Sequence, residues 1–441
     1  MKNYLKRSQA SRSLSLLLAI SLILISVTSL FSCVKLPSES LTREEILANM
    51  EERDGGFSSV HEYLDDWGIR GFSSMKMSGV ELAYKNYYYK DLPAPKEFAK
   101  SVAMLYLDNC LESTDPADST AVTDALISCF VAATEDRYAA YRTASEYSDY
   151  VTDMSGSFVG IGITVQYIEE EIVIIKIIDD SPAEEAGIQV GDIVLAVDGV
   201  SVREAGYDAS INSIRGEEGT AVTLTLDRDG EAVTVVATRR PVVEPTVEYE
   251  LNDGVGYILI TSFKDNTAEQ FIAAVDYMEK NGAKGLIFDL RTNTGGYLSA
   301  VGKMVGYLVP EGTVIASFSN DYAPDLVAEG SHTLSLPCVI LTNEYTASAS
   351  ELFTAALLDY EKMGLIECTT VGKTTYGKGV MQSTLTFTDK SALTLTVAYY
   401  NSPLGKNHDG VGLTPDVEAE YSPEHDGQLE AAYTEIAKLI G

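Results

Sequence analysis

The chain has 441 residues and a formal net charge of −33 at pH 7, from 65 acidic and 32 basic side chains. This imbalance argues against a nucleic-acid-binding protein, because binding to phosphates depends on clustered Lys and Arg that release counterions. It does not indicate disorder, since 45% of the residues are hydrophobic and only 22% are charged, which is enough to bury sizeable cores. At about 150 residues per domain, the length suggests about three domains.

The first 33 residues differ in character from the rest. They contain four basic residues and no acid, and an apolar run over 14–31 ends just before Cys33. A basic stretch followed by such a run is typical of a secretory signal, and Cys33 after a small residue resembles the lipidation site of a bacterial lipoprotein. An uncleaved signal anchor and an ordinary cleaved signal are the alternatives. All three predict that the body of the chain lies outside the cytoplasmic membrane.

Residues 34–56 are polar and suit a tether between this leader and the body. From 57 to 152 the sequence predicts a helical region, because segments such as 96–107 and 122–128 place apolar residues three and four apart.

Four cysteines follow Cys33, and none of them lies in a C-x-x-C pair or near a His at ligand spacing, so we expect no metal site. Cys338 lies in an apolar, strand-like run and is interpreted as a core residue rather than a nucleophile. Whether Cys110 and Cys129 pair is left open by the sequence.

From 153 to 240 the sequence changes to strands and turns. Apolar, strand-like runs recur, and one short helix has Ser181 as its N-cap, Pro182 in its first position and Gly187 at its end. This order of elements resembles a PDZ domain, in which an open sheet edge accepts a peptide as an added strand and a loop of amides captures its terminal carboxylate.

The resemblance implies where a peptide C-terminus would bind. By position, the carboxylate-binding loop is Phe158, Val159, Gly160, Ile161 and Gly162. The alternative interpretation is that these glycines only shape a turn.

Residues 241–422 predict a core of alternating strands and helices, with strands at 255–260, 285–291 and 337–342 and an amphipathic helix at 267–281. Alternation of this kind favours a mainly parallel sheet, whose chemistry gathers in the loops that leave the strands. A C-terminal helix is expected within 423–441.

Two of these loops contain candidate catalytic groups. The run 346–351 precedes a helix, where Ser and Thr often serve only as caps. A serine at such a strand-to-helix junction is also well placed as a nucleophile, because the free amides of the helix start stabilise an oxyanion. None of the four His lies in a segment with other candidate groups. Lys378, between Gly377 and Gly379, is the alternative base, provided that burial lowers its pKa.

Three runs together, at 289–296, 346–351 and 377–382, resemble the C-terminal processing peptidases, which are serine peptidases with a Ser-Lys dyad and an embedded PDZ domain. The resemblance covers about residues 60–420. It departs from the family pattern at Thr346, Thr294 and a longer interval between the two dyad residues. It implies these site residues: nucleophile Ser348, base Lys378, orienting Gln382, oxyanion amides from Ala349 and from Gly295 or Gly296, and supporting Glu351 and Asp359.

The sequence thus predicts an α/β multidomain protein with a helical N-terminal region, a β-sandwich-like PDZ domain and an α/β protease core with a mixed, mainly parallel sheet. The implied activity is an extracytoplasmic serine endopeptidase, without a metal or cofactor, that acts on proteins with exposed apolar C-termini. The helices expected at the N-terminal and C-terminal ends could pair between subunits and form a homo-oligomer. A catalytically silent PDZ scaffold and a core that binds small apolar ligands are the competing hypotheses.

Overall fold

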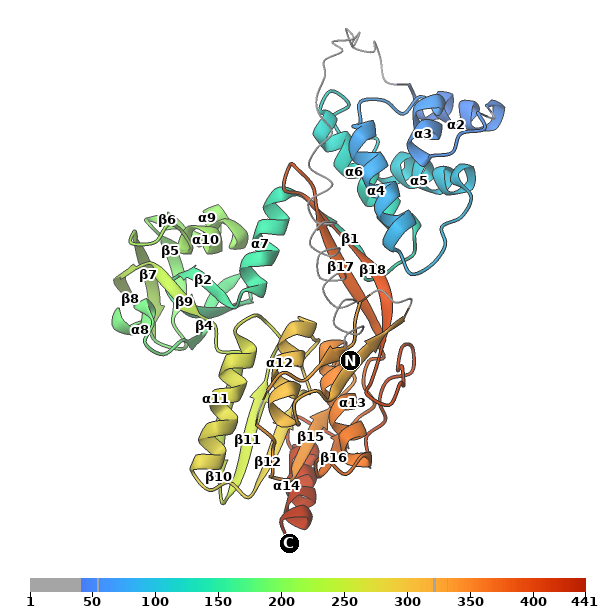
Figure 1. Cartoon of the computed structure of the whole chain (residues 1–441). Coiled ribbons are helices and arrows are strands. Elements are labelled where there is room, and N and C mark those ends of the chain that lie inside the picture. The colour runs from blue at the N-terminus through green and yellow to red at the C-terminus, as the bar shows by residue number, and fades with distance from the viewer. Residues whose placement is uncertain (1–40, 54, 320–322, 331) are drawn as a thin grey trace, which may run out of the picture.

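The computed structural model of the chain describes residues 41–53, 55–319, 323–330 and 332–441. The predicted leader with its Cys33 and residues 34–40 of the predicted tether lie outside the described residues. The prediction of a tether is wrong for 43–52, which form a helix whose Ile46 and Met50 are buried in the core of the first region. Figure 1 shows a bundle of helices, a smaller domain built mainly from strands, and a sheet with its helices. This confirms the predicted α/β multidomain fold. Among the helices described, none is both long and apolar enough to cross a membrane.

The first region is a bundle of helices whose starts are fixed by capping residues. Thr42 and Glu45 form a reciprocal capping box at the first helix, and Asp118 accepts bonds from two free amides at the last. Apolar faces turn inward, and Trp67, the single Trp of the chain, is fully buried. The helices are α2 (Arg43–Glu52), α3 (Val60–Trp67), α4 (Ser74–Tyr87), α5 (Pro95–Asn109) and α6 (Ser119–Ala133).

Two thiols meet inside this bundle. Cys110, just after α5, and Cys129, on α6, have their sulfur atoms 3.7 Å apart, and both are free. The pairing that the sequence leaves open is therefore within reach in space. Cys338 is fully buried among apolar residues, as predicted for a core residue.

A long hairpin of two strands joins the helical bundle to the C-terminal sheet (Figure 1). Its second strand, β18, pairs with β1 beside the bundle and with β13 at the other end. Leu393, Leu395, Val397 and Ala398 of β18 belong to the hydrophobic core of the bundle. These strands are β1 (Ala140–Arg142), β13 (Val314–Phe318), β14 (Leu326–Val327), β17 (Val380–Thr386) and β18 (Ala392–Asn401).

The domain beside the bundle is an antiparallel sheet of order β3-β4-β5-β7-β8, with β6 on β5 and a separate β2–β9 pair. The helix α7 (Ala144–Met154), which has no buried residue along its described length, leads into it. Its core contains only residues between Ile161 and Ala237. Its elements are β2 (Ser157–Gly160), β3 (Ile163–Ile168), β4 (Glu171–Ile177), α8 (Pro182–Glu185), β5 (Ile193–Val197), β6 (Val200–Ser201), α9 (Val202–Ala205), α10 (Tyr207–Ile214), β7 (Ala221–Arg228), β8 (Glu231–Thr238) and β9 (Arg240–Val243).

The third region is built on a sheet of order β10-β11-β12-β15-β16-β19. Only the β10–β11 pair is antiparallel, so the sheet is mixed and mainly parallel, as predicted. Its elements are β10 (Val247–Asn252), β11 (Val255–Ile260), α11 (Thr267–Lys280), β12 (Gly285–Asp289), α12 (Leu298–Leu308), β15 (Cys338–Thr342), α13 (Ala349–Lys362), β16 (Cys368–Gly372), β19 (Val417–Glu418) and α14 (Gly427–Ile440).

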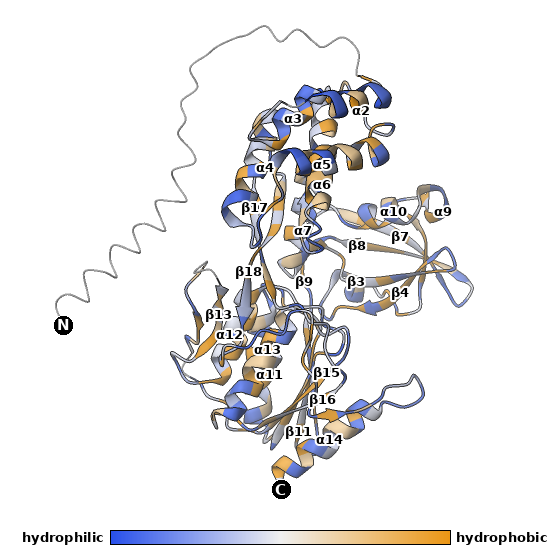
Figure 2. Cartoon of the chain, turned by 90° about the vertical axis from the view of Figure 1, so that its right-hand side faces the viewer, coloured by the Kyte–Doolittle hydropathy of each residue, from blue (hydrophilic) through white to orange (hydrophobic). Residues whose placement is uncertain are grey.

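Helices cover both faces of this sheet. Leu286 and Phe288 of β12 face the larger core with α11, α12 and α13, whereas Ile287 between them packs with Ile436 of α14. Because both faces are buried, the central strands are continuous apolar runs rather than alternating ones. Figure 2 shows these strands largely in the colours of hydrophobic residues.

Candidate active site

Three loops meet at the carboxyl ends of the parallel strands β12, β15 and β16. They are residues 290–297, 343–348 and 373–379. A Cβ built on Gly295 would lie 2.9 Å from Cβ of Ser348 and 3.1 Å from the amide nitrogen of Ala349. Only glycine fits at this close approach, and its φ of 108° also requires glycine. The first two loops are therefore packed directly against each other.

Ser348 stands between β15 and α13 in a strained conformation. Its φ is 57° and its ψ is −117°, a region that costs a residue with a side chain about 1–3 kcal/mol and that is found mainly at functional sites. The residue is half-buried and directly precedes the helix, so the positive end of the helix dipole faces it. Capping alone does not account for this geometry, because an N-cap residue normally has an extended backbone.

The carboxylate of Glu351 connects the Ser348 segment to the Lys378 segment. It is fully buried and accepts bonds from the amides of Ser348 (2.9 Å), Gly377 (2.7 Å) and Lys378 (2.7 Å), and from the Thr375 hydroxyl (2.5 Å). A buried carboxylate with this many donors is well stabilised. The family resemblance implied only a supporting role for Glu351, but the structure makes it the link between the two segments.

Lys378 lies in a largely dry environment. Burial lowers the pKa of its amine, against the opposing effect of the carboxylates of Asp136 and Glu351. This is the direction that a lysine base requires. Its Nζ lies 4.5 Å from the centroid of the Tyr138 ring. Between the described residues, no hydrogen bond joins Lys378 Nζ to the Ser348 side chain.

A buried pair that the sequence did not indicate, Tyr400 and His408, supports both segments from behind. The Tyr400 hydroxyl lies 2.9 Å from the carbonyl oxygen of Ser348 and 2.5 Å from that of Lys378. His408 Nε2 lies 3.2 Å from the same hydroxyl, and burial lowers the pKa of this imidazole. Neither residue lies in the three runs that carry the family resemblance, so the sequence offered no signal for them.

Gln382 has other partners than the predicted one. Its amide nitrogen donates to the Thr396 hydroxyl (3.3 Å) and to the carbonyl of Val380 (3.4 Å), at a register shift between β17 and β18. In the described hydrogen bonds it does not contact Lys378, so its orienting role stays a prediction.

The predicted oxyanion residues divide into two groups. The Gly295 amide donates to Oδ1 of the buried Asn293 (2.9 Å), whose backbone carbonyl in turn accepts from the Ala347 amide. Gly295 therefore holds the loop rather than offering a free donor. The amides of Ala349 and Gly296 have no hydrogen-bond acceptor among the described residues. These two are the donors that remain for an oxyanion.

Asp359 lies away from Ser348, contrary to its predicted place near the site. It stands eleven residues farther along α13, which corresponds to about 16 Å of helix. Its carboxylate accepts from the Ser402 hydroxyl and the Leu404 amide (3.1 Å) after β18. Asp359 thus anchors that loop and has no direct part in the site.

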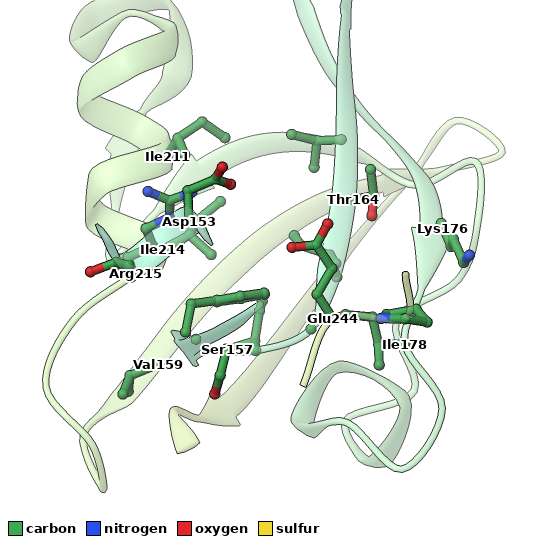
Figure 3. Close-up of a pocket in the computed structure, with 18 of the residues that line it drawn as sticks. Asp153, Ser157, Val159, Thr164, Lys176, Ile178, Ile211, Ile214, Arg215 and Glu244 are labelled. Carbon is green, nitrogen blue, oxygen red and sulfur yellow. The ribbon is translucent and has the colours of Figure 1, made fainter. Parts of the chain in front are cut away.

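The predicted carboxylate-binding residues line a groove of about 530 Å³ between the smaller domain, the helix α7 and the part of the third region that contains Glu248 and Thr261. Phe158, Val159 and Gly160 lie in strand β2 rather than in a loop, because they pair with β9. Ile161 and Gly162 form the short connection to β3. Figure 3 shows Ile211 and Ile214 on one side of this groove and Thr164 on the other.

Two family models match this chain, one in the third region and one in the smaller domain. Residues 254–419 match the model of peptidase family S41, and residues 159–238 match the PDZ domain model. The probable CtpA-like serine protease of Staphylococcus haemolyticus is 35% identical over 308 residues, which is 69% of this chain and 61% of that protein. The corresponding protein of Staphylococcus epidermidis is 34% identical over 68% of this chain and 61% of its own length.

The chain therefore spans about three-fifths of the length of these curated relatives. Among solved structures, a putative S41 protease from Bacteroides fragilis covers 82% of this chain and 97% of its own, with a TM-score of 0.50 and 17% identity. At that identity the likeness concerns the fold alone.

Proposed function

The chain belongs to peptidase family S41 and contains a PDZ domain, and from this premise we propose that it is an extracytoplasmic serine endopeptidase that recognises protein C-termini. Ser348 is the nucleophile and Lys378 the general base. The PDZ groove binds the apolar C-terminus of a protein substrate as an added strand.

In the proposed reaction, neutral Lys378 takes the hydroxyl proton of Ser348 while the serine oxygen attacks the carbonyl carbon of the peptide bond. The electron pair of the C=O bond moves onto its oxygen, which the amides of Ala349 and Gly296 stabilise. The C–N bond then breaks as the lysine ammonium returns the proton to the leaving amine. Water hydrolyses the acyl-enzyme through the same groups.

One observation carries this proposal: the buried Glu351 carboxylate accepts from the amides of both Ser348 and Lys378. One rigid group thereby fixes the distance between the two backbones, and the serine keeps a strained conformation that positions its side chain. For proton transfer, Lys378 Nζ has to come within hydrogen-bond reach of the serine hydroxyl, which the length of a lysine side chain permits.

An extracytoplasmic location rests on the leader, with Cys33 as the proposed lipid attachment site. A lipid anchor would hold an acidic body at a membrane whose anionic headgroups repel it. Metabolic labelling with an alkyne fatty acid tests this, because labelling of the full chain should disappear in Cys33→Ala. Labelling that persists in this variant would support a different attachment.

The activity is tested with an unfolded protein such as casein. We expect Ser348→Ala and Lys378→Ala each to lower cleavage at least about a thousandfold, without loss of the folded state by circular dichroism. Ser128→Ala and Lys303→Ala, which change exposed residues of α6 and α12, serve as controls. Cleavage should rise with pH, because only the neutral amine of Lys378 accepts a proton. Cleavage by the full chain that Ser348→Ala leaves intact would overturn the assignment, and no cleavage by any form would favour a silent PDZ scaffold.

A further inference from the structure

We propose that Tyr138, a residue of the helical N-terminal region, is a positioning residue for Lys378 that closes the lysine amine off from water. The inference rests on the proposed function, since it assigns a purpose to a dry environment around the base. It also gives the helical region a direct part in the active site, although this region lies outside both matched domains.

The loop that carries Tyr138 is anchored to the hairpin strand β18. It connects α6 to β1, and its Asp136 is buried. The Asp136 carboxylate accepts from the Tyr138 amide (3.0 Å), from the Thr396 amide (3.1 Å) and from the Thr396 hydroxyl (3.1 Å). One carboxylate thus fixes both the shape of the loop and its place on the strand.

The bonds between Asp136 and Thr396 extend to Gln382. The Thr396 hydroxyl that donates to Asp136 also accepts from the Gln382 amide nitrogen (3.3 Å). Asp136, Thr396 and Gln382 therefore form one hydrogen-bonded chain beside the segment that begins at Lys378. The helical region contacts the base through the Tyr138 ring and contacts β17 through this chain.

The Tyr138 ring covers the end of the lysine side chain. Lys378 Nζ lies 4.5 Å from the ring centroid, and the guanidinium carbon of Arg137 lies 4.9 Å from it. The Tyr138 hydroxyl is buried and has no hydrogen-bond partner in the described part of the chain. Burial raises the pKa of this phenol to about 12, so the ring stays neutral near neutral pH.

Several charged and titratable groups surround Lys378, and they act in opposite directions. The carboxylates of Asp136 on the loop, Glu351 on α13 and Asp409 after β18 favour the charged amine, while Arg137 on the loop disfavours it. Tyr400 and His408 lie behind its backbone and are neutral at pH 7, because burial raises the pKa of the phenol and lowers that of the imidazole.

Exclusion of water is the largest influence on Lys378, and it favours the neutral form. The ring of Tyr138 has two opposing effects: it excludes water, and its π-face attracts a cation. The pKa of the amine is lowered in spite of three nearby carboxylates, so burial as a whole outweighs their attraction. We infer that the Tyr138 ring, which lies 4.5 Å from Nζ, contributes to this burial.

The test separates these two effects with three substitutions. Tyr138→Phe keeps the ring, Tyr138→Leu keeps an apolar cover without the π-face, and Tyr138→Ala opens the site to water. Tyr87→Ala, at an exposed tyrosine of the same helical region, is the matched control. The pKa of Lys378 is measured by competitive acetylation from about pH 6 to about pH 11 and peptide mass spectrometry, in the full chain carrying Ser348→Ala.

We expect Tyr138→Ala to raise the pKa of Lys378 by about one unit. In the chain that keeps Ser348, the same substitution should lower kcat/KM near neutral pH about tenfold, with recovery at alkaline pH. Tyr138→Phe and Tyr87→Ala should match the parent chain, and Tyr138→Leu should not raise the pKa. An unchanged lysine pKa in folded Tyr138→Ala would overturn the inference. Equal cleavage by Ser348→Ala and the parent would instead overturn the proposed function, because the acetylation measurement does not depend on activity.

Discussion

The PDZ domain and the helical N-terminal region are both attached to the protease core, but they are attached in different ways. The hydrophobic core of the PDZ domain consists only of its own residues. The core of the helical region includes four side chains of β18, a strand that also pairs with the core strand β13. The PDZ domain is therefore a separable module, whereas the helical region and the hairpin of β17 and β18 share one folding unit.

The contact at the base of the PDZ domain supports this difference. The Glu244 amide donates to the carbonyl of Gly156 (2.9 Å), so the chain leaves the domain where it entered. One ion pair, between Lys176 of β4 and Glu248 of β10, also joins this domain to the core. The helical region has more connections, because β1 and the 136–138 loop join it to β18 and Lys76 joins it to the hairpin tip. A domain with adjoining ends is suited to move as a body, and one with several joints is suited to hold a site in place.

Deleting each region should produce the largest contrast. Replacing residues 157–243 by two glycines should leave a folded protein that still cleaves casein, because the two ends already meet. Deleting 41–139 exposes Leu393, Leu395 and Val397, which removes about 5–9 kcal/mol of burial, comparable to the whole stability of a domain. We expect that chain to be aggregated or unfolded by size-exclusion chromatography and circular dichroism. A soluble, cooperative fold without 41–139 would contradict the shared unit.

A matched pair of cavity substitutions should give a smaller contrast. Leu395→Ala and Leu224→Ala each truncate a fully buried leucine, and each should cost about 2–5 kcal/mol. The loss in Leu395→Ala should destabilise the unit that contains Lys378 and lower casein cleavage. The loss in Leu224→Ala should be confined to the PDZ domain. Hydrogen exchange followed by mass spectrometry measures which region is destabilised in each variant. Exchange that rises equally throughout the chain in both variants would contradict the view that the PDZ domain is a separable module.

The smallest effect is expected at the hairpin tip, where Lys76 of α4 bonds to Asp389 (2.7 Å) and Asp124 (3.0 Å). Partial burial raises the pKa of Asp389, but the bonds from Lys76 and Ser391 outweigh it and hold the pKa at about 2. The stabilisation is thus present above the ordinary carboxylate range and is lost as the pH falls toward 2. Because Asp389 is about half-exposed, we expect Asp389→Asn to cost only about 0.5–1 kcal/mol at neutral pH.

Urea denaturation at several pH values checks this small effect. The parent and Asp389→Asn should differ near neutral pH and converge below the folded pKa of Asp389. Asp91→Asn, at a carboxylate outside the tip, is the control. A difference that stays constant down to the acid limit would show that the ion pair is not its source.

The elements that the sequence predicted are those whose pattern is local. The central strands of the core are continuous apolar runs, and α11 follows a regular amphipathic period almost to its predicted end. The family resemblance located Ser348 and Lys378 because its motifs are short and contiguous. These predictions needed no knowledge of which segments meet.

The rest depended on contacts between distant segments. Phe158 lies in a strand because its partner, β9, returns about eighty residues later, which no local pattern indicates. Asp359 was predicted near the site, but the direction of α13 carries it away from Ser348. Tyr138 reaches Lys378 because β1 and Asp136 hold its loop on the distant strand β18. The role of such a residue depends on which distant strand pairs with the strand next to it. Spacing along the chain does not show that pairing.

The pairing of β1 with β18 has a consequence for the order of folding. Ala140 pairs with Thr394, so the two strands are separated by about 250 residues of chain, and such distant contacts form slowly. During synthesis the helices of the bundle are made long before β18, so the apolar face that β18 covers stays exposed until this strand is made. The bundle therefore exposes apolar side chains until the hairpin is made, and the contact between Tyr138 and Lys378 forms only after that.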